Sequence, residues 1–325
     1  MSFVQCPVIA SAFALRINPA IGVPLKACRP RFHATPPSFA FTSNFSTQSI
    51  RFTQNGPRPT SLGQVPDNRS MNSRLQGKNV LITGASSGIG EACARHFAQA
   101  GSNLLLSARR MDRLERLKQE LESQHPDIKV STFQLDVRDR AKVKATALTF
   151  GDVDVLINNA GLVIGLDKLE DITEDAMDTM IDTNVKGLVH VTQSVLPGMR
   201  ARNKGHIINI GSVAGQQAYA NGSIYCASKA AVASITKALL YETVDTAIRI
   251  SEINPGMVET EFSVVRFRGD KDKAESVYKG LQPLDGNDIA ETVLFVAGRP
   301  EHVNIAEMLV FPTNQAAATT VYRKP

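Results

Sequence analysis

The sequence lacks tryptophan and contains only four cysteines. Cys6 and Cys28 lie near the N-terminus, and Cys93 and Cys226 have neither CxxC nor Cys/His spacing. This pattern argues against a disulfide framework and against a zinc or other metal site, and it suits a reducing compartment. No run of about 18 or more apolar residues is present, so we expect no membrane-spanning segment.

Acidic residues are absent from residues 1–66, whereas that stretch contains the basic residues Arg16, Lys26, Arg29, Arg31, Arg51 and Arg58. The whole chain has a formal net charge of +5, so residues 67–325 carry a net charge of −1. A nearly neutral body argues against the basic surface with which nucleic-acid-binding proteins contact phosphates. The 43% hydrophobic content of the 325 residues is enough for a sizeable core.

Residues 1–70 are also rich in Ser, Thr, Pro, Phe and Ala. This composition is typical of an organelle transit peptide, and we predict a disordered leader that directs the chain to mitochondria. A disordered tail without an address is the alternative. A secretory signal is disfavoured because no basic residue precedes the apolar stretch 8–15. A start at Met71 would give a leaderless cytoplasmic form.

From residue 77 onward, short apolar runs alternate with stretches of helical period. We expect strands at 79–83, 103–107, 129–135, 154–157, 206–210, 248–253 and 306–311, with helices between them. Asp112 and Glu115 have the spacing of a capping box at the start of one helix, 112–124. Such alternation predicts an α/β fold: a single doubly wound (Rossmann) domain, residues 75–325, with a seven-stranded parallel sheet flanked by helices.

The first strand is followed by Thr83-Gly84-Ala85-Ser86-Ser87-Gly88-Ile89-Gly90 and then a helix. Glycine at 84 permits a tight turn, and glycines at 88 and 90 let the backbone approach a pyrophosphate at the helix N-terminus. The alternative is a glycine-rich turn without a ligand. The strand before it and the helix after it favour dinucleotide binding.

Two arginines and no acid follow the second strand, at Arg109 and Arg110. An acid there would bind the 2′-hydroxyl of NAD, whereas arginine binds the 2′-phosphate of NADP. The sequence therefore favours NADP(H), unless both arginines are only solvated surface residues. Asp136, after the third strand, is expected to accept a hydrogen bond from the adenine amino group, and Asn159 to lie near the adenine ribose.

Tyr225 and Lys229 are four residues apart, so they share one face of a helix. An ammonium near a phenol lowers the pKa of the phenol, and the pair can then transfer a proton to or from a substrate oxygen. Chance pairing on a solvated helix is the alternative. Ser212 ends the fifth strand, at the edge of the sheet where ligands bind. Asn184 lies in a helical stretch although Asn is a poor helix former.

TGASSGIG at 83–90, NNAG at 158–161, Asn184, Ser212, YCASK at 225–229 and NPG at 254–256 occur in this order. The chain thereby resembles the short-chain dehydrogenase/reductase family over residues 75–325. The resemblance implies that Tyr225 is the general acid/base and that Lys229 lowers its pKa and binds the nicotinamide ribose. It also implies that Ser212 holds the substrate oxygen and that Asn184 fixes a water that relays protons.

The resemblance further implies cofactor contacts from Thr83, Gly84, Ser86, Ser87, Gly88, Ile89, Gly90, Arg109, Arg110, Asp136, Val137, Asn159, Ala160, Gly161, Tyr225, Lys229, Pro255, Gly256, Val258 and Thr260. It implies a homotetramer and a mobile flap over the substrate at 260–280. Segments 211–215, 222–225, 258–267 and 311–315 are most similar to the NADP-dependent 3-hydroxy acid dehydrogenases, also described as L-allo-threonine or serine dehydrogenases. The segment 139–154 is shorter than is usual in that branch, which puts local stability or the cofactor rim in question.

The predicted reaction moves a hydride between NADP(H) and the C3 carbinol of a small 3-hydroxy acid, such as L-serine, L-allo-threonine or a 3-hydroxyisobutyrate-like acid. Such a substrate brings a carboxylate, and Arg266 in the flap is the candidate partner for it. The alternative for Arg266 is an ion pair with Glu261 or another acid that only stiffens the flap. Alternative functions are a 3-oxoacyl-thioester or general carbonyl reductase and, from another class, a dinucleotide-binding scaffold without turnover.

Overall fold

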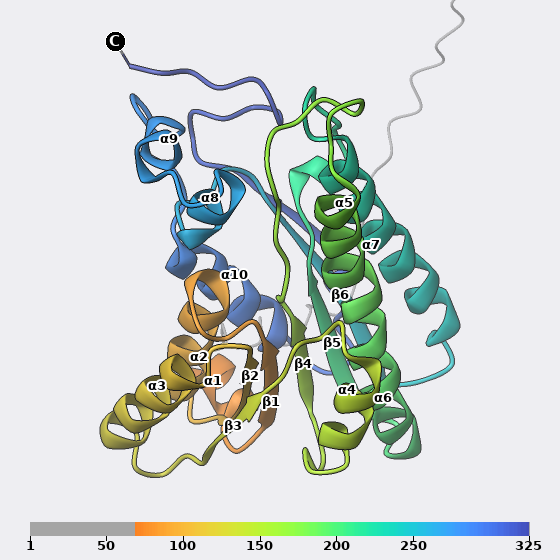
Figure 1. Ribbon diagram of the computed structural model, residues 1–325. Helices are drawn as coiled ribbons and strands as arrows, with labels where there is room; N and C mark the ends of the chain where they lie inside the picture. Colours follow the sequence, from red (N-terminus) through yellow and green to blue (C-terminus); the bar gives the residue numbers. More distant parts are fainter. Residues whose placement is uncertain (1–68, 325) are drawn as a thin grey trace, which may run out of the picture. The chain divides into compact units, whose positions relative to one another are not determined.

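The computed structural model describes residues 69–324 (Figure 1). Seven strands form one parallel sheet in the order β3-β2-β1-β4-β5-β6-β7, which confirms the predicted fold. The strands run β1 (Asn79–Thr83), β2 (Asn103–Ala108), β3 (Val130–Gln134), β4 (Val155–Asn158), β5 (Gly205–Ile210), β6 (Ile248–Pro255) and β7 (Glu307–Val310). Each differs from its expected range by at most a few terminal residues. The predicted leader falls almost wholly outside the described residues.

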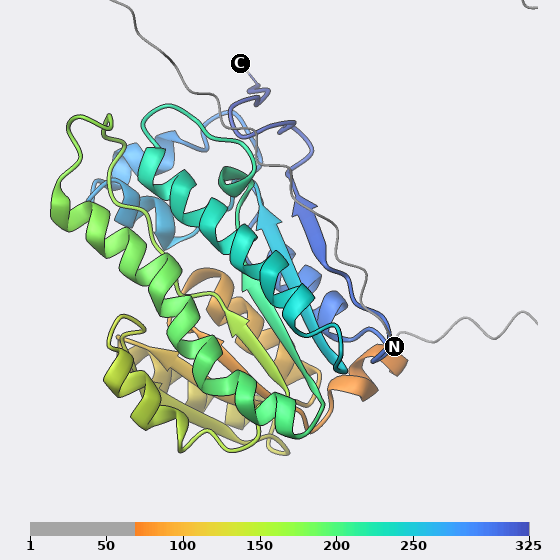
Figure 2. The same cartoon turned by 90° about the vertical axis from the view of Figure 1, so that its right-hand side faces the viewer.

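Helices cover both faces of the sheet (Figure 2). One face packs against α1 (Arg69–Leu75), α2 (Gly88–Gln99), α3 (Met111–Gln124) and α10 (Gly286–Ala297). The other face packs against α4 (Arg140–Ala147), α6 (Leu188–Ala201) and α7 (Ser223–Glu242). Strand residues therefore alternate between two buried clusters, as the period of two in a strand requires. Ile208 and Ile253 enter the first cluster, and Ile207 and Ile250 enter the second.

The strand order reverses between β1 and β4, which are neighbours although β2 and β3 intervene in the chain. Ligands of open α/β sheets bind at such a switch point, outside the carboxyl ends of the strands. The glycine turn after β1, residues 159–161 after β4 and Ser212 after β5 all lie at that edge. The topology therefore places most of the predicted site residues in one cleft.

Two local predictions differ from the structure. The helix α3 begins after Arg110 without a side-chain cap, so the Asp112–Glu115 capping box is wrong. Asp112 instead pairs with Arg116, and Glu115 accepts a hydrogen bond from Thr132 on the adjacent strand. The second difference is a π-helical turn, Asp182–Gly187, between α5 (Glu174–Ile181) and α6.

The segment 260–280 forms two short helices, α8 (Glu261–Arg266) and α9 (Lys271–Ser276), beside the cleft. The amide of Gly165 donates to the carbonyl of Arg266 at 2.9 Å, and Arg268 pairs with Asp167 at 2.6 Å. These contacts join the flap to the loop that follows β4. The shortened segment 139–154 retains one helix, α4, whose Val143 is fully buried in the core.

Within residues 69–324, no helix is long and apolar enough to cross a membrane. The same part of the chain has no group of His, Cys, Asp and Glu side chains placed to hold a metal ion.

Candidate active site

The glycine turn holds the ends of β1 and β4 close together. Gly84 has a φ of +68°, and a Cβ there would lie 2.9 Å from the side-chain nitrogen of Asn159 and 3.0 Å from Cα of Ala160. Thr83 Oγ1 accepts from the amides of Asn159 and Ala160, both at 3.0 Å. Glycine at 84 therefore serves the close approach of two loops as well as the turn itself.

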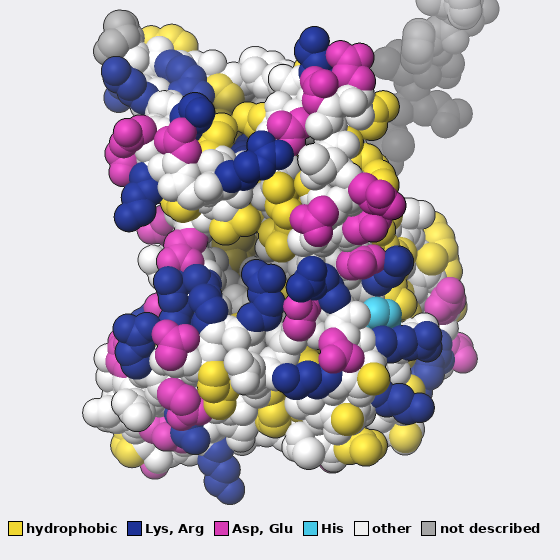
Figure 3. Space-filling view, viewed as in Figure 1, with side chains coloured by type: hydrophobic (Ala, Val, Ile, Leu, Met, Phe, Trp, Pro, Cys, Tyr) yellow, Lys and Arg dark blue, Asp and Glu magenta, His cyan; other side chains and the backbone are white. Residues whose placement is uncertain are grey.

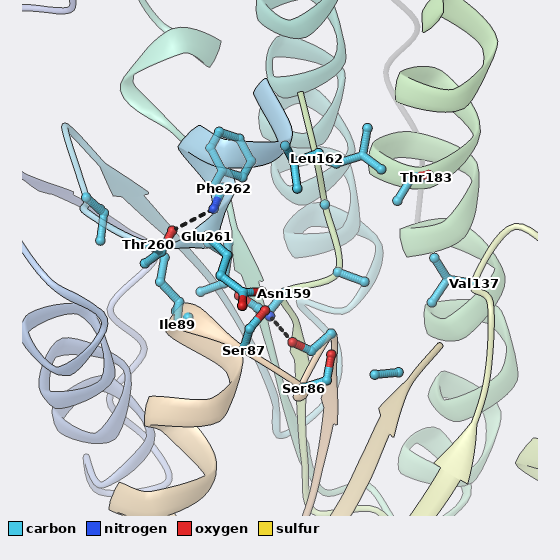
Figure 4. Close-up of a pocket in the computed structure, with 18 of the residues that line it drawn as sticks. Ser86, Ser87, Ile89, Val137, Asn159, Leu162, Thr183, Thr260, Glu261 and Phe262 are labelled. Atoms are coloured by element: carbon cyan, nitrogen blue, oxygen red, sulfur yellow. Dashed lines mark hydrogen bonds between the residues drawn. The ribbon is translucent and has the colours of Figure 1, made fainter. Parts of the chain in front are cut away.

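The N-terminus of α2 is open toward the cleft. Ser87 is the N-cap residue, but its side chain accepts no hydrogen bond from the helix amides. The Oγ atoms of Ser86 and Ser87 accept instead from Arg110. Figure 4 shows these two serines below Glu261, with Thr260 and Ile89 beside them. Free amides of a first helical turn and hydroxyls beside a guanidinium are a suitable cradle for phosphate.

The two arginines after β2 differ in their contacts. Arg110 is held by Ser86 and Ser87 and by Glu261, whose Oε2 lies 2.9 Å from Nη1. Glu261 also pairs with Arg113 at 2.6 Å. Arg109 is exposed, and its guanidinium forms no hydrogen bond or ion pair with the described residues. Arg109 is therefore the cation free to meet a phosphate, whereas Arg110 is already oriented.

Asp136 lines the cleft, as predicted, but its carboxylate is already engaged. Arg138 binds both of its oxygens, at 2.7 Å for the nearest pair, and holds the pKa of Asp136 below its ordinary value. Arg138 thus fixes an ionised acceptor at the adenine end of the cleft.

The catalytic candidates lie deep in the cleft. Tyr225 and Ser212 are 8% and 9% exposed, and Lys229 is 6% exposed. Burial raises the pKa of Tyr225, and a hydrogen bond from Ser212 and the charge of Arg266 only partly oppose this. Burial therefore dominates the pKa of Tyr225, and the predicted lowering of this pKa by Lys229 stays a prediction.

Lys229 is anchored to the sheet rather than to Tyr225. Its Nζ donates to the carbonyl of Ile210 at 2.8 Å, and burial lowers its pKa to about 8. A Cβ on Gly161 would lie 3.6 Å from this Nζ and 3.3 Å from Oδ1 of Asn184. Glycine at 161 therefore lets the loop after β4 pass directly beside both side chains.

Asn184 occupies the π-helical turn and is 2% exposed. Its Oδ1 accepts from the amide of Leu162 at 2.8 Å, and its Nδ2 donates to the carbonyl of Leu162 and to Ser228. Asn184 therefore lies at an irregular turn of the helix and not in a regular α-helical stretch. Such π turns often lie at functional sites. These contacts link the loop after β4 to α7, one residue before Lys229.

Arg266 forms no ion pair with Glu261 or with another acid of the described residues, so that alternative is wrong. Its Nη2 donates to the hydroxyl of Tyr219 at 2.5 Å, and its guanidinium carbon lies 5.6 Å from the Tyr219 ring centre. Its Nε is buried and has no hydrogen-bond partner. Arg266 also acts electrostatically on Tyr225, although it does not line the cleft itself.

The cleft brings together most of the predicted cofactor-binding residues: Gly84, Ser86, Ser87, Gly88, Ile89, Arg109, Arg110, Asp136, Val137, Asn159, Ala160, Gly161, Tyr225, Lys229, Pro255, Gly256, Val258 and Thr260. Thr83, Gly90, Asn184 and Arg266 are not in its lining. Figure 3 shows Lys and Arg side chains gathered along one rim of the hollow and hydrophobic side chains inside it.

Sequence reasoning missed four residues of this region: Arg113, Tyr219, Glu252 and Gln315. Gln315 is 5% exposed, and its Oε1 accepts from the amide of Met257 at 2.8 Å, which supports the turn after β6. Gln315 lies in segment 311–315, which resembles the 3-hydroxy acid dehydrogenases, but that resemblance assigns no contact to its side chain. Glu252 carried a sequence signal: it is the one acidic residue of the strand Ile248–Pro255.

The sequence model described as "short chain dehydrogenase" matches residues 78–270, more than half of the chain. The chain belongs to the short-chain dehydrogenase family. An NADP-dependent 3-hydroxy acid dehydrogenase of Schizosaccharomyces pombe is 51% identical over 257 residues, which are 78% of this chain and 99% of that protein. Sulfoacetaldehyde reductase 2 of Chromohalobacter salexigens is 43% identical over 73% of this chain and 95% of that protein.

Among solved structures, the closed form of serine dehydrogenase complexed with NADP⁺ is 42% identical. It matches with a TM-score of 0.70 and covers 76% of this chain and 100% of that one. This short-chain dehydrogenase is therefore an NADP-dependent oxidoreductase that acts on CH–OH groups. The donors of its cleft fit the cofactor: the open helix amides would hold a pyrophosphate, and Ser86, Arg109 and Arg110 would hold a 2′-phosphate.

Proposed function

We propose that this dehydrogenase interconverts the C3 hydroxyl of small 3-hydroxy acids and the corresponding carbonyl. L-Serine, L-allo-threonine and 3-hydroxyisobutyrate-like acids are the candidate substrates. The relatives support this choice by their names, which refer to 3-hydroxy acids, serine and sulfoacetaldehyde. All of these compounds carry an acidic group a few bonds from the carbon that reacts.

The proton transfer is assigned to Tyr225, assisted by Ser212. Both hydroxyls are buried at the carboxyl ends of the strands, and the hydrogen bond between them orients the phenol toward one substrate oxygen. In oxidation Tyr225 takes the hydroxyl proton, and in reduction it returns a proton to the carbonyl oxygen. Bound NADP(H) supplies or accepts the hydride. Phe262 packs edge-on against Tyr225 with ring centres 5.8 Å apart, which limits water at this point.

Lys229 and Asn184 are assigned supporting roles. The ammonium of Lys229 opposes the burial that raises the pKa of Tyr225, once ligand binding draws it toward the phenol. Its position is set by the carbonyl of Ile210, and that of Asn184 by Leu162 and Ser228. The predicted water-relay role of Asn184 remains a prediction.

The observation that carries the substrate assignment is the environment of Arg266. Arg266 is half-buried, but its Nε is buried and has no partner, and such an unpaired donor is costly unless a ligand completes it. The charge of Arg266 partly opposes the rise in the pKa of Tyr225, so it lies within electrostatic reach of the reacting oxygen. We infer that a substrate carboxylate takes this donor, and that Tyr219 holds the guanidinium in place.

A panel assay tests the assignment. With NADP⁺, small 3-hydroxy acids should be oxidised, and uncharged alcohols of the same size and acyl thioesters should react more slowly. Arg266→Leu should raise KM for 3-hydroxy acids by roughly tenfold or more and should spare uncharged alcohols and ketones.

Arg268→Leu is the matched control, because this flap arginine pairs with Asp167 on the surface and is 54% exposed in its side chain. It should change KM for both substrate types by less than about threefold. If Arg266→Leu impairs charged and uncharged substrates alike, Arg266 only supports the flap. Preference for thioesters would identify the enzyme as a 3-oxoacyl-thioester reductase instead.

We also propose, from the sequence of residues 1–70, that the chain is imported into mitochondria, and from the family resemblance that it assembles as a homotetramer. A fusion of residues 1–70 to a fluorescent protein should enter mitochondria, and a diffuse cytosolic signal would refute the address. Sedimentation of the dehydrogenase domain measures the assembly, and a monomer would refute the tetramer.

A further inference from the structure

Glu252 is a buried carboxylate for which the reaction described above has no use. It lies on β6 and is 1% exposed. Ile248 and Ile250 on the same strand pack with Leu239 of α7, and the alternation of a strand turns Glu252 to this same face. Its Oε1 is buried and has no hydrogen-bond partner among the described residues.

The carboxylate of Glu252 lies next to Gly211, which lines the cleft, but Glu252 is not part of that lining. A Cβ at Gly211 would collide with Oδ1 of Asn254 and with Oε1 of Glu252, so these two oxygens fill the place of the missing side chain. Lys229 Nζ binds the carbonyl of Ile210, the residue immediately before. The ammonium and the carboxylate therefore contact consecutive residues at the end of β5.

Four ionisable groups form a cluster at this point. Glu307 on β7 is opposite Glu252 in the parallel register, and Lys229 and Lys237 approach from α7. Burial raises the pKa of Glu252 to about 7, and Glu307 adds to the rise, whereas both lysines oppose it. The effect is reciprocal: burial lowers the pKa of Lys229 to about 8, and the charge of Glu252 acts in the opposite direction.

We propose that Glu252 is a positioning residue of the catalytic site, whose carboxylate keeps Lys229 protonated while Lys229 acts on Tyr225. Only a protonated Lys229 can favour the phenolate of Tyr225. Burial alone favours the neutral amine of Lys229, whereas the buried negative charge of Glu252 favours the ammonium. The inference rests on the proposed roles of Tyr225 and Lys229, and infrared titration of Glu252 tests its coupling to Lys229 independently of those roles.

The test is the pH dependence of kcat for oxidation of a 3-hydroxy acid by Glu252→Gln. Removal of the negative charge should let Lys229 lose its proton at lower pH. The alkaline limb of the kcat profile should therefore move down by about one pH unit, so that activity at pH 9 falls severalfold relative to wild type. KM for NADP⁺ should stay within about twofold, because Glu252 does not line the cleft.

Glu307→Gln is the matched control, because it removes a carboxylate that acts on Glu252 and is 36% exposed in its side chain. Without Glu307, the carboxylate of Glu252 ionises more readily, so the alkaline limb should stay in place or move slightly upward. A downward shift in Glu252→Gln alone supports the inference. An unmoved limb in Glu252→Gln, or equal downward shifts in both variants, would overturn it.

A second measurement does not depend on the folding of Glu252→Gln. Infrared titration of the wild type and of Lys229→Met follows the protonated carboxyl of Glu252, the buried acid that titrates near neutral pH. Because coupling between two sites is reciprocal, loss of the ammonium should keep Glu252 protonated to higher pH. The same titration in both proteins would show that the two groups are uncoupled. Activity of Tyr225→Phe is the separate test of the proposed function.

Discussion

Two groups of charged and polar residues in and around the cleft lie in opposite environments. We call Ser86, Arg110, Arg113 and Glu261 the phosphate rim. Its charged side chains are 36–45% exposed and pair with one another. We call Asn184, Ser212, Tyr225, Lys229 and Glu252 the catalytic floor. None of these residues is more than 9% exposed.

The difference shows that the exposure of a charged group decides how strongly it acts on stability and on neighbouring pKa values. At the rim, water screens each ion pair, so that any single pair contributes less than about 1 kcal/mol and can exchange partners with a ligand. On the floor, burial shifts the pKa values of Tyr225, Lys229 and Glu252 away from their ordinary values. Substitution of one floor residue should therefore shift the pKa values of the others, whereas substitution of a rim residue should affect only its direct partners.

The largest expected effect is on the floor. Tyr225→Phe removes the transferable proton and keeps the volume of the ring. We expect kcat to fall by about 10² or more, because a positioned general acid/base contributes that much. The Kd of NADP⁺, measured by fluorescence titration, should change less than about twofold. Activity within a few-fold of wild type would show that Tyr225 is not the acid/base.

The next effect concerns the rim. Double replacement of Arg109 and Arg110 by Ala should weaken NADPH binding by a factor of tens, because only NADPH has the 2′-phosphate that they would contact. NADH binding should change by less than about threefold. Calorimetric titration of both cofactors measures the ratio. Equal weakening of NADPH and NADH would mean that the two arginines are surface residues without a role in cofactor choice.

A smaller effect is expected on the free energy of unfolding, through the floor residue Glu252. The pKa of Glu252 is raised from 4.5 to about 7, so the native state binds its proton more tightly than the unfolded state. Stability from this group is therefore lost as pH rises from about 4.5 to 7. Glu252→Gln should remove the loss and be more stable than wild type by about 1–3 kcal/mol at pH 8.

Urea unfolding of both proteins at pH 5, 6, 7 and 8 measures this difference. Buried His206, whose pKa is lowered by burial, acts in the opposite direction over this range, but it is present in both proteins and cancels. A difference that grows with pH and levels off above pH 7 is the expected result. A difference that is the same at every pH would mean that Glu252 does not titrate there.

The smallest effect is again at the rim. Arg113→Ala removes one of the two partners of Glu261 and leaves Arg110 in place. We expect a change below about 1 kcal/mol in unfolding free energy and below about fivefold in the Kd of NADPH. A change well above 1 kcal/mol in unfolding free energy, or a tenfold or larger change in the Kd of NADPH, would show that rim substitutions are not weaker in effect than floor substitutions.

The sequence by itself determined the approximate positions of the seven strands along the chain and the glycine turn after the first of them. Strands β1, β2 and β4 are short, mostly apolar runs, and the turn with Gly84, Gly88 and Gly90 follows β1 directly. A parallel sheet covered on both faces favours such runs, and a phosphate turn favours such glycines. The spacing of Tyr225 and Lys229 likewise fixes their common helix face. These are local properties, in which residues near in the chain are near in space.

Only the tertiary structure decided the partners and protonation of charged groups. Glu261 pairs with Arg110 and Arg113 rather than Arg266, although Arg266 is nearer in the sequence. The pKa of Tyr225 is raised, because segments distant in the sequence bury its hydroxyl. Glu252 lies near Lys229 only because β5, β6 and α7 meet there. Desolvation and charge pairing depend on distance through space, and the spacing of residues along the chain does not encode it.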